Sequence, residues 1–389
     1  MLDMRQVSKV YRTAMVETHA LRSLDLHVKE GEFVAVTGPS GSGKTTFLNI
    51  AGLLENFTGG EFTLDGENVK GLSDDARSRL RNQKIGFIFQ GFNLIPDLNL
   101  FDNVDVPLRY RGLPASDRKQ RIEEALGQVG LGSRMKHFPA ELSGGQQQRV
   151  AIARTLAYKP EVLLFDEPFG ALDTQTRSHL RREIRALLKK VKVPSIFITH
   201  DQEEALELGD RVAVLNQGHI EQIGTPFEIY NHPATEYVAT FLGAANIIDA
   251  TVRKDYLEVG SARLAATLDP SKFREGDCVK IVFRPEDVSL SRGELLRPPL
   301  TNISTALVEE ISFVGAYERV RLRLERGGDE CRTEESPFYL TTETPESQQK
   351  AIIATRPKPE ATATRLQIGE RVTVAITSFT VLEPQKNTK

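Results

Sequence analysis

The first 240 residues alternate short apolar runs with longer segments in which apolar side chains recur at helical spacing. The runs include EFVAVTG, KIGFIFQ, VLLFDEP, SIFITH and RVAVLNQG. Residues 116–129 and 176–190 place apolar residues three and four positions apart among arginine, lysine and glutamate, which predicts surface helices. Because strands that alternate with helices form parallel sheets covered by helices, the pattern predicts an α/β domain over residues 1–240.

After residue 240 the pattern changes to short runs in which polar and apolar residues take turns, as in CVKIVFRPEDVSL, RVRLRLE and RVTVAITSFTVL. This alternation is typical of half-buried strands, so residues 241–389 predict an all-β module, a small barrel. Within it, residues 333–364 are rich in Thr, Glu, Pro, Ser and Gln, and we expect most of this stretch to be a long mobile loop.

The composition changes this picture little. A net charge of -3 with 26% charged residues argues against a strongly basic nucleic-acid-binding protein. No stretch approaches the roughly 20 apolar residues that cross a bilayer, so we expect any membrane role to come through a partner. The two cysteines, Cys278 and Cys331, are too few for a disulfide framework, and we expect small reduced residues.

The stretch GPSGSGKTT lies between the strand EFVAVT and the helical segment FLNIAGLL. In that context the spacing G-x-x-x-x-G-K-T predicts a phosphate-binding loop, whose backbone N–H groups and following helix N-terminus face an anion. Lys44 is expected to hold the β- and γ-phosphates, Thr45 to bind Mg²⁺ through its hydroxyl, and Thr46 to bind the α-phosphate. The predicted nucleotide-binding residues here are Gly38, Ser40, Gly41, Ser42, Gly43, Lys44, Thr45 and Thr46.

A second, acidic part of the site is predicted in VLLFDEP. Asp166 and Glu167 follow a buried strand, and ligands bind at the carboxyl ends of strands in open α/β sheets. Asp166 is expected to orient Mg²⁺ through water. Glu167 is expected to accept a proton from the attacking water.

With these two motifs and LSGGQQQR at residues 142–149, the chain resembles the ATP-binding cassette (ABC) transport ATPases over about residues 1–240. The resemblance implies a P-loop NTPase fold with a helical subdomain at about residues 91–160, and hydrolysis of ATP with Mg²⁺. It also implies head-to-tail pairing of two cassettes, in which the signature of one closes over the nucleotide of the other. The signature residues that this implies are Ser143, Gly144, Gly145 and Gln146.

Four further positions match the family individually. Gln90, which ends GFIFQ, resembles the glutamine that senses Mg²⁺ and water, and His200, which ends SIFITH, resembles the switch histidine that contacts the γ-phosphate. Asp173 in GALD resembles the aspartate at the dimer seam, with a turn cap as the alternative. Tyr11 in VSKVYR resembles the aromatic residue that stacks on adenine, with a packed edge-strand residue as the alternative.

Two branches of the family remain open. THDQEEAL, GTPFEIYNHPATEYVATFLGAANII and FRPEDVSL resemble importer ATPases for sulfate, polyamines, iron or sugars, which carry a C-terminal OB-like (TOBE-type) regulatory domain. VYRTAMVETHALRSLDL and FQGFNLIPDLNLFDNVDVPL resemble lipoprotein-release and macrolide-efflux cassettes. We predict an ATPase at the cytoplasmic face of the membrane that powers import of a small solute such as sulfate, another anion, a polyamine or iron, with efflux or lipoprotein release as the alternative.

The resemblance implies three kinds of partner: a second cassette, transmembrane permease subunits and, through the permease, an extracytoplasmic solute-binding protein. Phe92, Leu94, Ile95 and Leu98 are predicted to be exposed apolar residues that receive the permease, with packing inside the helical subdomain as the alternative.

A soluble ABC ATPase that acts on nucleic acid is less favoured. Residues 45–142 show no sustained heptads, and the chain has no second phosphate loop. The β module shows no interleaved basic and aromatic stripe of the kind that binds oligonucleotides, so we expect no nucleic-acid partner.

Overall fold

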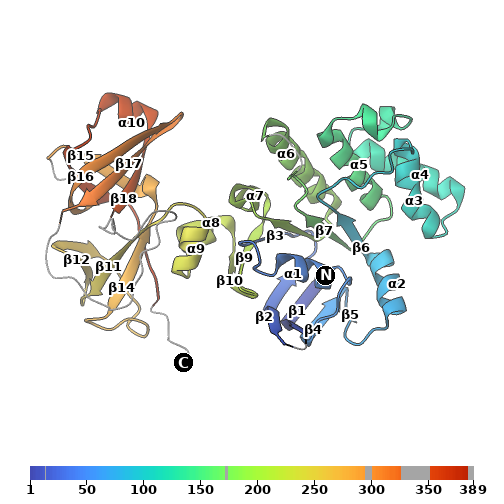
Figure 1. The fold of residues 1–389 in the computed structure, drawn as a ribbon, viewed down its shortest axis with the longest axis horizontal. Coiled ribbons are helices and arrows are strands. Elements are labelled where there is room, and N and C mark those ends of the chain that lie inside the picture. The colour runs from blue at the N-terminus through green and yellow to red at the C-terminus, as the bar shows by residue number, and fades with distance from the viewer. Residues whose placement is uncertain (14, 171–173, 294–299, 326–350, 384–389) are drawn as a thin grey trace. The chain divides into compact units, whose positions relative to one another are not determined.

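The computed structural model describes residues 1–13, 15–170, 174–293, 300–325 and 351–383 (Figure 1). The chain divides into two compact units, Met1–Phe227 and Glu228–Lys389. The sequence analysis placed the domain boundary at about residue 240. The structure places it at residues 227–228, so that two short helices before residue 242 belong mainly to the second unit.

A six-stranded sheet forms the centre of the first unit, in the order β10-β9-β3-β8-β7-β6. The five strands from β9 to β6 are parallel, and β10 pairs antiparallel with β9. The α/β prediction for this part of the chain is therefore confirmed. The strands are β3 (Phe33–Thr37), β6 (Ile85–Ile88), β7 (Val162–Asp166), β8 (Ser195–Thr199), β9 (Arg211–Asn216) and β10 (His219–Gly224).

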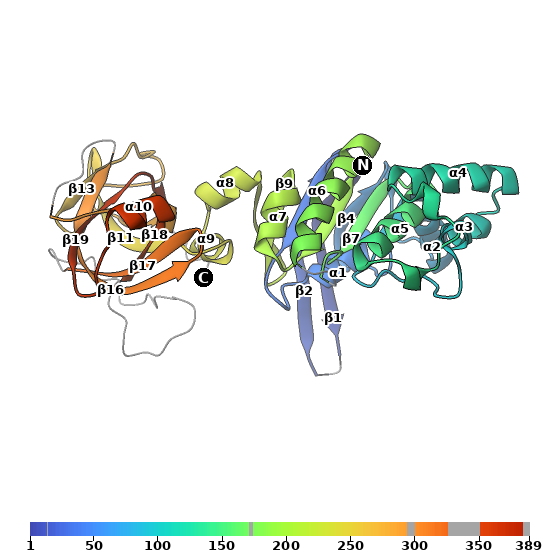
Figure 2. The same ribbon diagram turned by 90° about the horizontal axis from the view of Figure 1, so that it is seen from above.

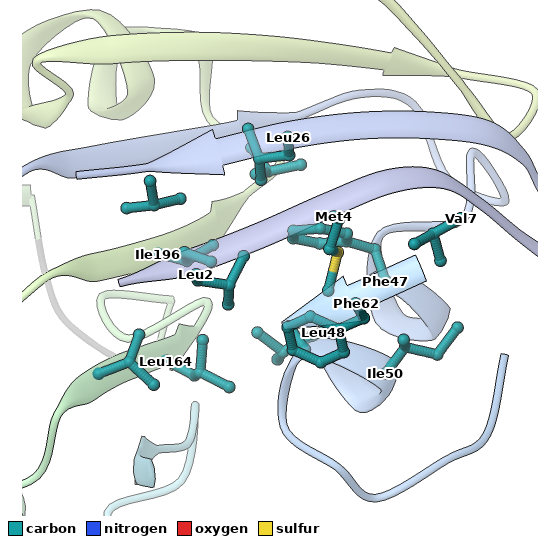
Figure 3. Packing of buried hydrophobic residues seen from close by; sticks show 14 of the residues in the cluster. Leu2, Met4, Val7, Leu26, Phe47, Leu48, Ile50, Phe62, Leu164 and Ile196 are labelled. Carbon is teal, nitrogen blue, oxygen red and sulfur yellow. The ribbon is translucent and has the colours of Figure 1, made fainter. Parts of the chain in front are cut away.

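A second, antiparallel sheet with the order β2-β1-β4-β5 packs over helix α1. Figure 3 shows the core between them: Met4 and Phe62 of this sheet lie close to Leu48 of α1, in the same cluster as Leu164 and Ile196 of the central sheet. This packing fixes α1 directly behind the predicted phosphate loop. The elements are β1 (Leu2–Arg12), β2 (Glu17–Val28), β4 (Gly59–Leu64), β5 (Glu67–Asn68) and α1 (Lys44–Ala51).

Three helices, α3, α4 and α5, gather on one side of the first unit in both views (Figures 1 and 2). They share an apolar core that includes Val104 of α3, Ile122 of α4 and Val150 of α5, and they fall within the predicted helical subdomain. The helices predicted over residues 116–129 and 176–190 are present as α4 and α6. The helices are α2 (Asp74–Lys84), α3 (Leu100–Tyr110), α4 (Ala115–Gln128), α5 (Gly144–Leu156), α6 (Thr174–Val191) and α7 (Gln202–Leu208), with 3₁₀ turns at Gly132–Arg134 and Pro139–Glu141.

Two five-stranded antiparallel sheets, β13-β12-β11-β14-β20 and β15-β19-β16-β17-β18, enclose one apolar core in the second unit, which agrees with an OB-like all-β domain. The first sheet comprises β11 (Asn246–Val252), β12 (Tyr256–Val259), β13 (Ala262–Ala265), β14 (Cys278–Phe283) and β20 (Thr380–Val381). The second comprises β15 (Val288–Ser291), β16 (Thr301–Val314), β17 (Tyr317–Leu324), β18 (Ala351–Pro357) and β19 (Arg371–Ile376). Two short helices, α8 (Pro226–Asn231) and α9 (Glu236–Phe241), precede β11, and α10 (Lys358–Ala363) lies between β18 and β19.

The mobile-loop prediction for residues 333–364 is wrong at its C-terminal end. Residues 351–357 form β18, which pairs in register with β17, and residues 358–363 form α10. The composition was misleading because Arg356, a charged residue, is only 2% exposed and is held by the Glu318 carboxylate and the Thr364 carbonyl. Residues 333–350 lie outside the described part of the chain.

The expectation of reduced cysteines is also wrong for Cys278, which is disulfide-bonded. Cys331 lies outside the described residues.

Candidate active site

Four loops of the first unit follow neighbouring strands of the parallel sheet. Gly38 follows β3, Gln90 comes two residues after β6, Glu167 follows β7 and His200 follows β8. Because parallel strands in register end at the same edge of a sheet, the topology brings these loops together. Four residues that the sequence predicted for one site therefore lie at one edge of the sheet.

The phosphate loop depends on glycine for its backbone shape. Gly41 and Gly43 have φ angles of 77° and 105°, in the left-handed region that side chains disfavour. A Cβ atom on Gly43 would also lie 2.5 Å from the Ala20 carbonyl oxygen, and one on Gly38 would lie 2.1 Å from that of Leu215. At Gly38 and Gly43 the neighbouring backbone therefore leaves no space for a side chain.

Lys44 is the first residue of α1 and is only 9% exposed. Its ammonium group donates hydrogen bonds of 2.9 Å to the carbonyl oxygens of Gly38 and Pro39. Burial lowers the pKa of Lys44, and the negative charge of Glu167 opposes this effect. The first turn of α1 has no side-chain cap and no acidic residue, so its N–H groups and this ammonium can receive an anion.

Two hydroxyl groups next to the loop need a polar partner. Thr37 Oγ1 and Ser42 Oγ are buried and have no hydrogen-bond partner among the described residues. Leaving such groups unsatisfied costs about 1–3 kcal/mol each, so a phosphate oxygen at this position would remove a penalty. Ser40 and Thr45 are exposed on the same loop and at the start of α1.

A divalent cation such as Mg²⁺ would find suitable donors here. Mg²⁺ prefers oxygen ligands, and Thr45, Asp166 and Gln90 offer a hydroxyl, a carboxylate and an amide oxygen. Burial, together with the adjacent charge of Glu167, raises the pKa of Asp166. A nearby cation would stabilise the ionised form of this buried carboxyl group, so the position suits a bound positive charge.

Glu167 and His200 face each other across the sheet edge. Glu167 Oε1 lies 3.0 Å from His200 Nδ1, and the Glu167 N–H donates to the Ile198 carbonyl at 3.0 Å. Glu167 has a φ of 45°, an unusual value for a residue with a side chain, and such strained positions cluster at functional sites. Gly170 makes room for Gln90, because a Cβ atom there would lie 2.9 Å from the Gln90 amide nitrogen.

Tyr11 lies beside α1 and is 39% exposed. Its hydroxyl donates a 2.6 Å hydrogen bond to Glu55 Oε2 and also interacts with the side chain of Thr46. Burial and the bond to Glu55 raise the pKa of this hydroxyl. The Lys9 ammonium lies 4.8 Å from the centre of the ring.

The signature residues begin α5 in the helical subdomain. Ser143 is the N-cap of α5: its Oγ accepts from the Gln146 N–H, and Gln146 Oε1 accepts from the Ser143 N–H, a reciprocal capping box. Ser143 is exposed and Gly144 half-buried, whereas Gly145 is buried. In Figure 1, α5 lies with α3 and α4, apart from α1, and within the described residues no hydrogen bond joins Ser143 to the phosphate loop.

Of the four apolar residues predicted to receive the permease, only Ile95 is exposed. Ile95 is 42% exposed, and Phe89, which the sequence analysis did not single out, is 38% exposed. Phe92 and Leu98 are half-buried, and Leu94 packs against the core of the helical subdomain, as the alternative interpretation stated.

The predicted seam residue Asp173 lies outside the described part of the chain.

Comparison with known proteins agrees with this site. A family model described as "ABC transporter" matches residues 21–170. The spermidine/putrescine import ATP-binding protein of Thermobifida fusca is 38% identical over 332 residues, which cover 83% of this chain and 83% of that protein. The chain belongs to the ATP-binding proteins of ABC transporters.

Two other relatives within this family are similar over most of their length. The Fe(3+) ions import ATP-binding protein of Rhizobium meliloti is 42% identical over 315 residues, which cover 79% of this chain and 78% of that protein. The sulfate/thiosulfate import ATP-binding protein of Bacillus cereus is 42% identical over 295 residues, which cover 75% of this chain and 79% of that protein. The dimeric structure of the bacterial ABC transporter cassette MJ0796 is 40% identical with a TM-score of 0.51, covering 58% of this chain and 99% of that one.

This ABC protein is therefore a nucleotide-binding ATPase. The cassette MJ0796 has also been solved in a post-hydrolysis state bound to ADP and Pi, with 39% identity and a TM-score of 0.51 to this chain. In the portion of the chain that the structure describes, no helix combines the length and apolarity needed to cross a membrane.

Sequence reasoning missed the residues that surround His200. Thr199, Asp201, Glu204 and Arg181 form a hydrogen-bonded network next to it. The spacing of Asp201 and Glu204 matches a helix N-terminus, which was the available signal. Arg181 is separated from them by a strand and lies on another helix, so no local pattern connects it to the site.

Proposed function

We propose that this chain is the ATP-hydrolysing subunit of an ABC importer, and that it cleaves ATP between its phosphate loop and the Glu167–His200 pair. The observation that carries the proposal is the 3.0 Å contact of His200 Nδ1 with Glu167 Oε1, at the sheet edge that also holds the loop. The family assignment supports the same chemistry.

The nucleotide would lie along the loop with its phosphates against the N-terminus of α1. Lys44 would pair with the β- and γ-phosphates and Thr46 would bind the α-phosphate. Tyr11 would stack on adenine, and its hydroxyl next to the Thr46 side chain supports this position. The other residues proposed to contact phosphate are Gly38, Ser40, Gly41, Ser42 and Gly43.

We further propose that Thr45, Gln90 and Asp166 hold Mg²⁺ together with the nucleotide. When bound, this ion neutralises charge that develops on the phosphate oxygens. The hard oxygen donors of the three residues support this choice.

Glu167 would act as the general base and His200 as the residue that orients it. A water molecule attacks the γ-phosphorus and loses a proton to the Glu167 carboxylate, while the bond to the β–γ bridging oxygen breaks and leaves ADP and inorganic phosphate. His200 lies close enough to Glu167 to orient its carboxylate and, with 66% of its side chain exposed, could also reach the γ-phosphate.

A second copy of the chain would complete each site. Ser143, Gly144, Gly145 and Gln146 would contact the γ-phosphate held by the partner copy, with the N-terminus of α5 behind them. The exposed Ser143 cap and the dimeric MJ0796 cassette support this arrangement. Asp173 would lie at the seam between the copies.

The proposed transport direction is import of a small solute at the cytoplasmic face of the membrane. The relatives named above are import proteins for polyamine, iron and sulfate. Permease subunits would bind beside Phe89 and Ile95, whose exposed apolar side chains suit a protein contact. An extracytoplasmic solute-binding protein would act through the permease.

The decisive test is mass spectrometry of membrane proteins that co-purify with tagged Glu167→Gln protein in the presence of Mg-ATP. We expect a multi-span permease that is encoded together with a solute-binding protein. A four-span permease with a large external domain would contradict import and would indicate an efflux or lipoprotein-release system. Lys44→Ala protein, whose affinity for ATP should be at least about tenfold weaker, serves as the control for ATP-dependent capture at an ATP concentration below its Kd.

A further inference from the structure

His200 lies between two residues whose hydrogen bonds meet at one hydroxyl group. Thr199, at the end of β8, is 1% exposed, and Asp201 follows His200 directly. Thr199 Oγ1 accepts a 2.9 Å hydrogen bond from the Asp201 N–H and donates a 2.7 Å bond to Glu204 Oε2. The backbone on both sides of His200 is therefore tied to the same buried hydroxyl.

A buried ion pair holds Glu204 in place. Glu204 on α7 is 3% exposed and Arg181 on α6 is 5% exposed, and Arg181 Nη2 lies 3.0 Å from Glu204 Oε1. Arg181 Nη1 also contacts Glu207 Oε2 at 3.1 Å. Each oxygen of Glu204 thus has one partner, Arg181 on one side and Thr199 on the other, which leaves the carboxylate little freedom to turn.

Asp201 connects the same two helices. Its Oδ1 accepts from the N–H groups of Glu203 and Glu204 at 3.0 and 3.2 Å and so caps α7. Its Oδ2 lies 3.3 Å from Arg181 and 3.7 Å from Arg177, both on α6. The loop that carries His200 is therefore joined to α6 and α7 through charged groups on either side.

The imidazole of His200 is itself 66% exposed and lies 3.0 Å from Glu167. An exposed side chain on a short loop keeps one geometry only if the loop backbone is held, and misplacement of a reacting group by about 1 Å can cost about 10²-fold in rate. We propose that Thr199, Glu204 and Arg181 are positioning residues, which hold the His200 loop so that the imidazole stays aligned with Glu167. The proposal rests on the proposed role of His200 in hydrolysis.

Thr199→Val tests this directly, because valine has nearly the same shape and lacks only the hydroxyl. We expect kcat for ATP hydrolysis to fall about tenfold while the Kd for ATP changes less than about twofold, since the phosphate loop is untouched. Thr199→Ser, which keeps the hydroxyl, should retain most of the activity. Equal losses in both variants, or an unchanged kcat in Thr199→Val, would overturn the proposal.

Arg185→Met is the matched control on α6. Arg185 lies one turn beyond Arg181 and bonds the Glu207 carbonyl and Asp210, so its loss perturbs α6 without reaching Thr199. Its kcat should equal that of the unmodified protein. If Thr199→Val does not fold, as judged by its melting curve, the double variant Arg181→Met/Glu204→Gln removes both buried charges together, and a folded double variant with unchanged kcat would overturn the proposal.

Combination with His200→Ala separates this inference from the proposed function. If His200→Ala leaves kcat unchanged, the role proposed for His200 is wrong and the positioning role falls with it. If His200→Ala lowers kcat, we expect Thr199→Val to cause no further loss in that background, because both act through the same imidazole. A further tenfold loss would leave the proposed function intact and overturn the positioning role.

Discussion

The ammonium nitrogen of Lys44 lies 2.9 Å from the carbonyl oxygen of Gly38, six residues earlier at the start of the same loop. This bond and the equal one to Pro39 fold the lysine side chain back over the loop, where a phosphate group would bind. The cation is thus held over the loop by neutral carbonyl groups, which cannot neutralise its charge as an anion would.

Replacement of Lys44 should therefore weaken nucleotide binding. We expect Lys44→Ala to raise the Kd for ATP by at least about tenfold, since hydrogen bonds to charged groups contribute about 1.5–3 kcal/mol each. Isothermal titration calorimetry measures this. The exposed Lys70, which bonds the Gly60 carbonyl, offers the control Lys70→Ala, and equal affinities in the two variants would contradict the assignment.

Removal of the proposed base should separate binding from hydrolysis. Glu167→Gln keeps a similar shape but cannot accept the proton, so hydrolysis should fall by about 10²-fold or more while ATP binding persists. Light scattering should detect a Mg-ATP-bound dimer. A monomer at high concentration, with ATP shown to be bound, would count against self-pairing. Glu161→Gln, at an exposed site just before β7, should hydrolyse ATP normally.

A bulky charge at the signature should block hydrolysis but not binding. Ser143→Arg removes the cap of α5 and places a cation where the partner nucleotide is proposed to lie, so we expect turnover to be lost and the Kd for ATP to stay within about twofold. Ser133→Arg introduces the same side chain at an exposed position of the same subdomain. If Ser133→Arg loses as much activity, the effect of Ser143→Arg is not specific to the signature.

The loop glycine Gly43 should not tolerate a methyl group. Gly43→Ala requires φ near 105° and a Cβ 2.5 Å from a carbonyl oxygen, so the free energy of unfolding should fall by about 1–3 kcal/mol. Gly127→Ala, in the last turn of α4 with no atom from outside the helix within 4 Å of the new Cβ, should instead stabilise by about 0.5 kcal/mol. Urea unfolding followed by circular dichroism compares them, and equal shifts would refute the proposed steric cause.

Asp166 should make stability depend on pH. Burial and the charge of Glu167 raise its pKa above 3.8 in the folded state, so the folded protein binds this proton more tightly than the unfolded chain does. Its contribution to stability therefore falls as pH rises from about that value to the raised pKa, and stays lost above it. We expect Asp166→Asn to increase the free energy of unfolding more at about pH 7 than at about pH 4, as measured by urea unfolding at both pH values. A smaller gain at pH 7 would show the opposite sign of shift.

The sequence by itself determined the elements whose signals are local. The phosphate loop needs glycines, a lysine and a threonine at fixed spacing between a strand and a helix, and all of them lie within one short stretch of the chain. The acid pair follows an apolar strand, and the parallel pattern was enough to expect it at the carboxyl edge of the sheet. His200 was assigned through the family resemblance.

Only the tertiary structure decided which side chains hold the site together. Arg181 reaches Glu204 from another helix, and Glu204 in turn accepts a hydrogen bond from Thr199. Tyr11 meets Glu55 across 44 residues. Contacts of this kind between elements leave no periodic trace in a sequence. The same reason explains β18: buried Arg356 counts as polar in composition, and its partner Glu318 lies on the neighbouring strand, so the strand became recognisable only once β17 was in place beside it. The sequence motifs were enough to predict the residues of the site. The residues that hold them in place could not be predicted, because their side chains meet only after folding.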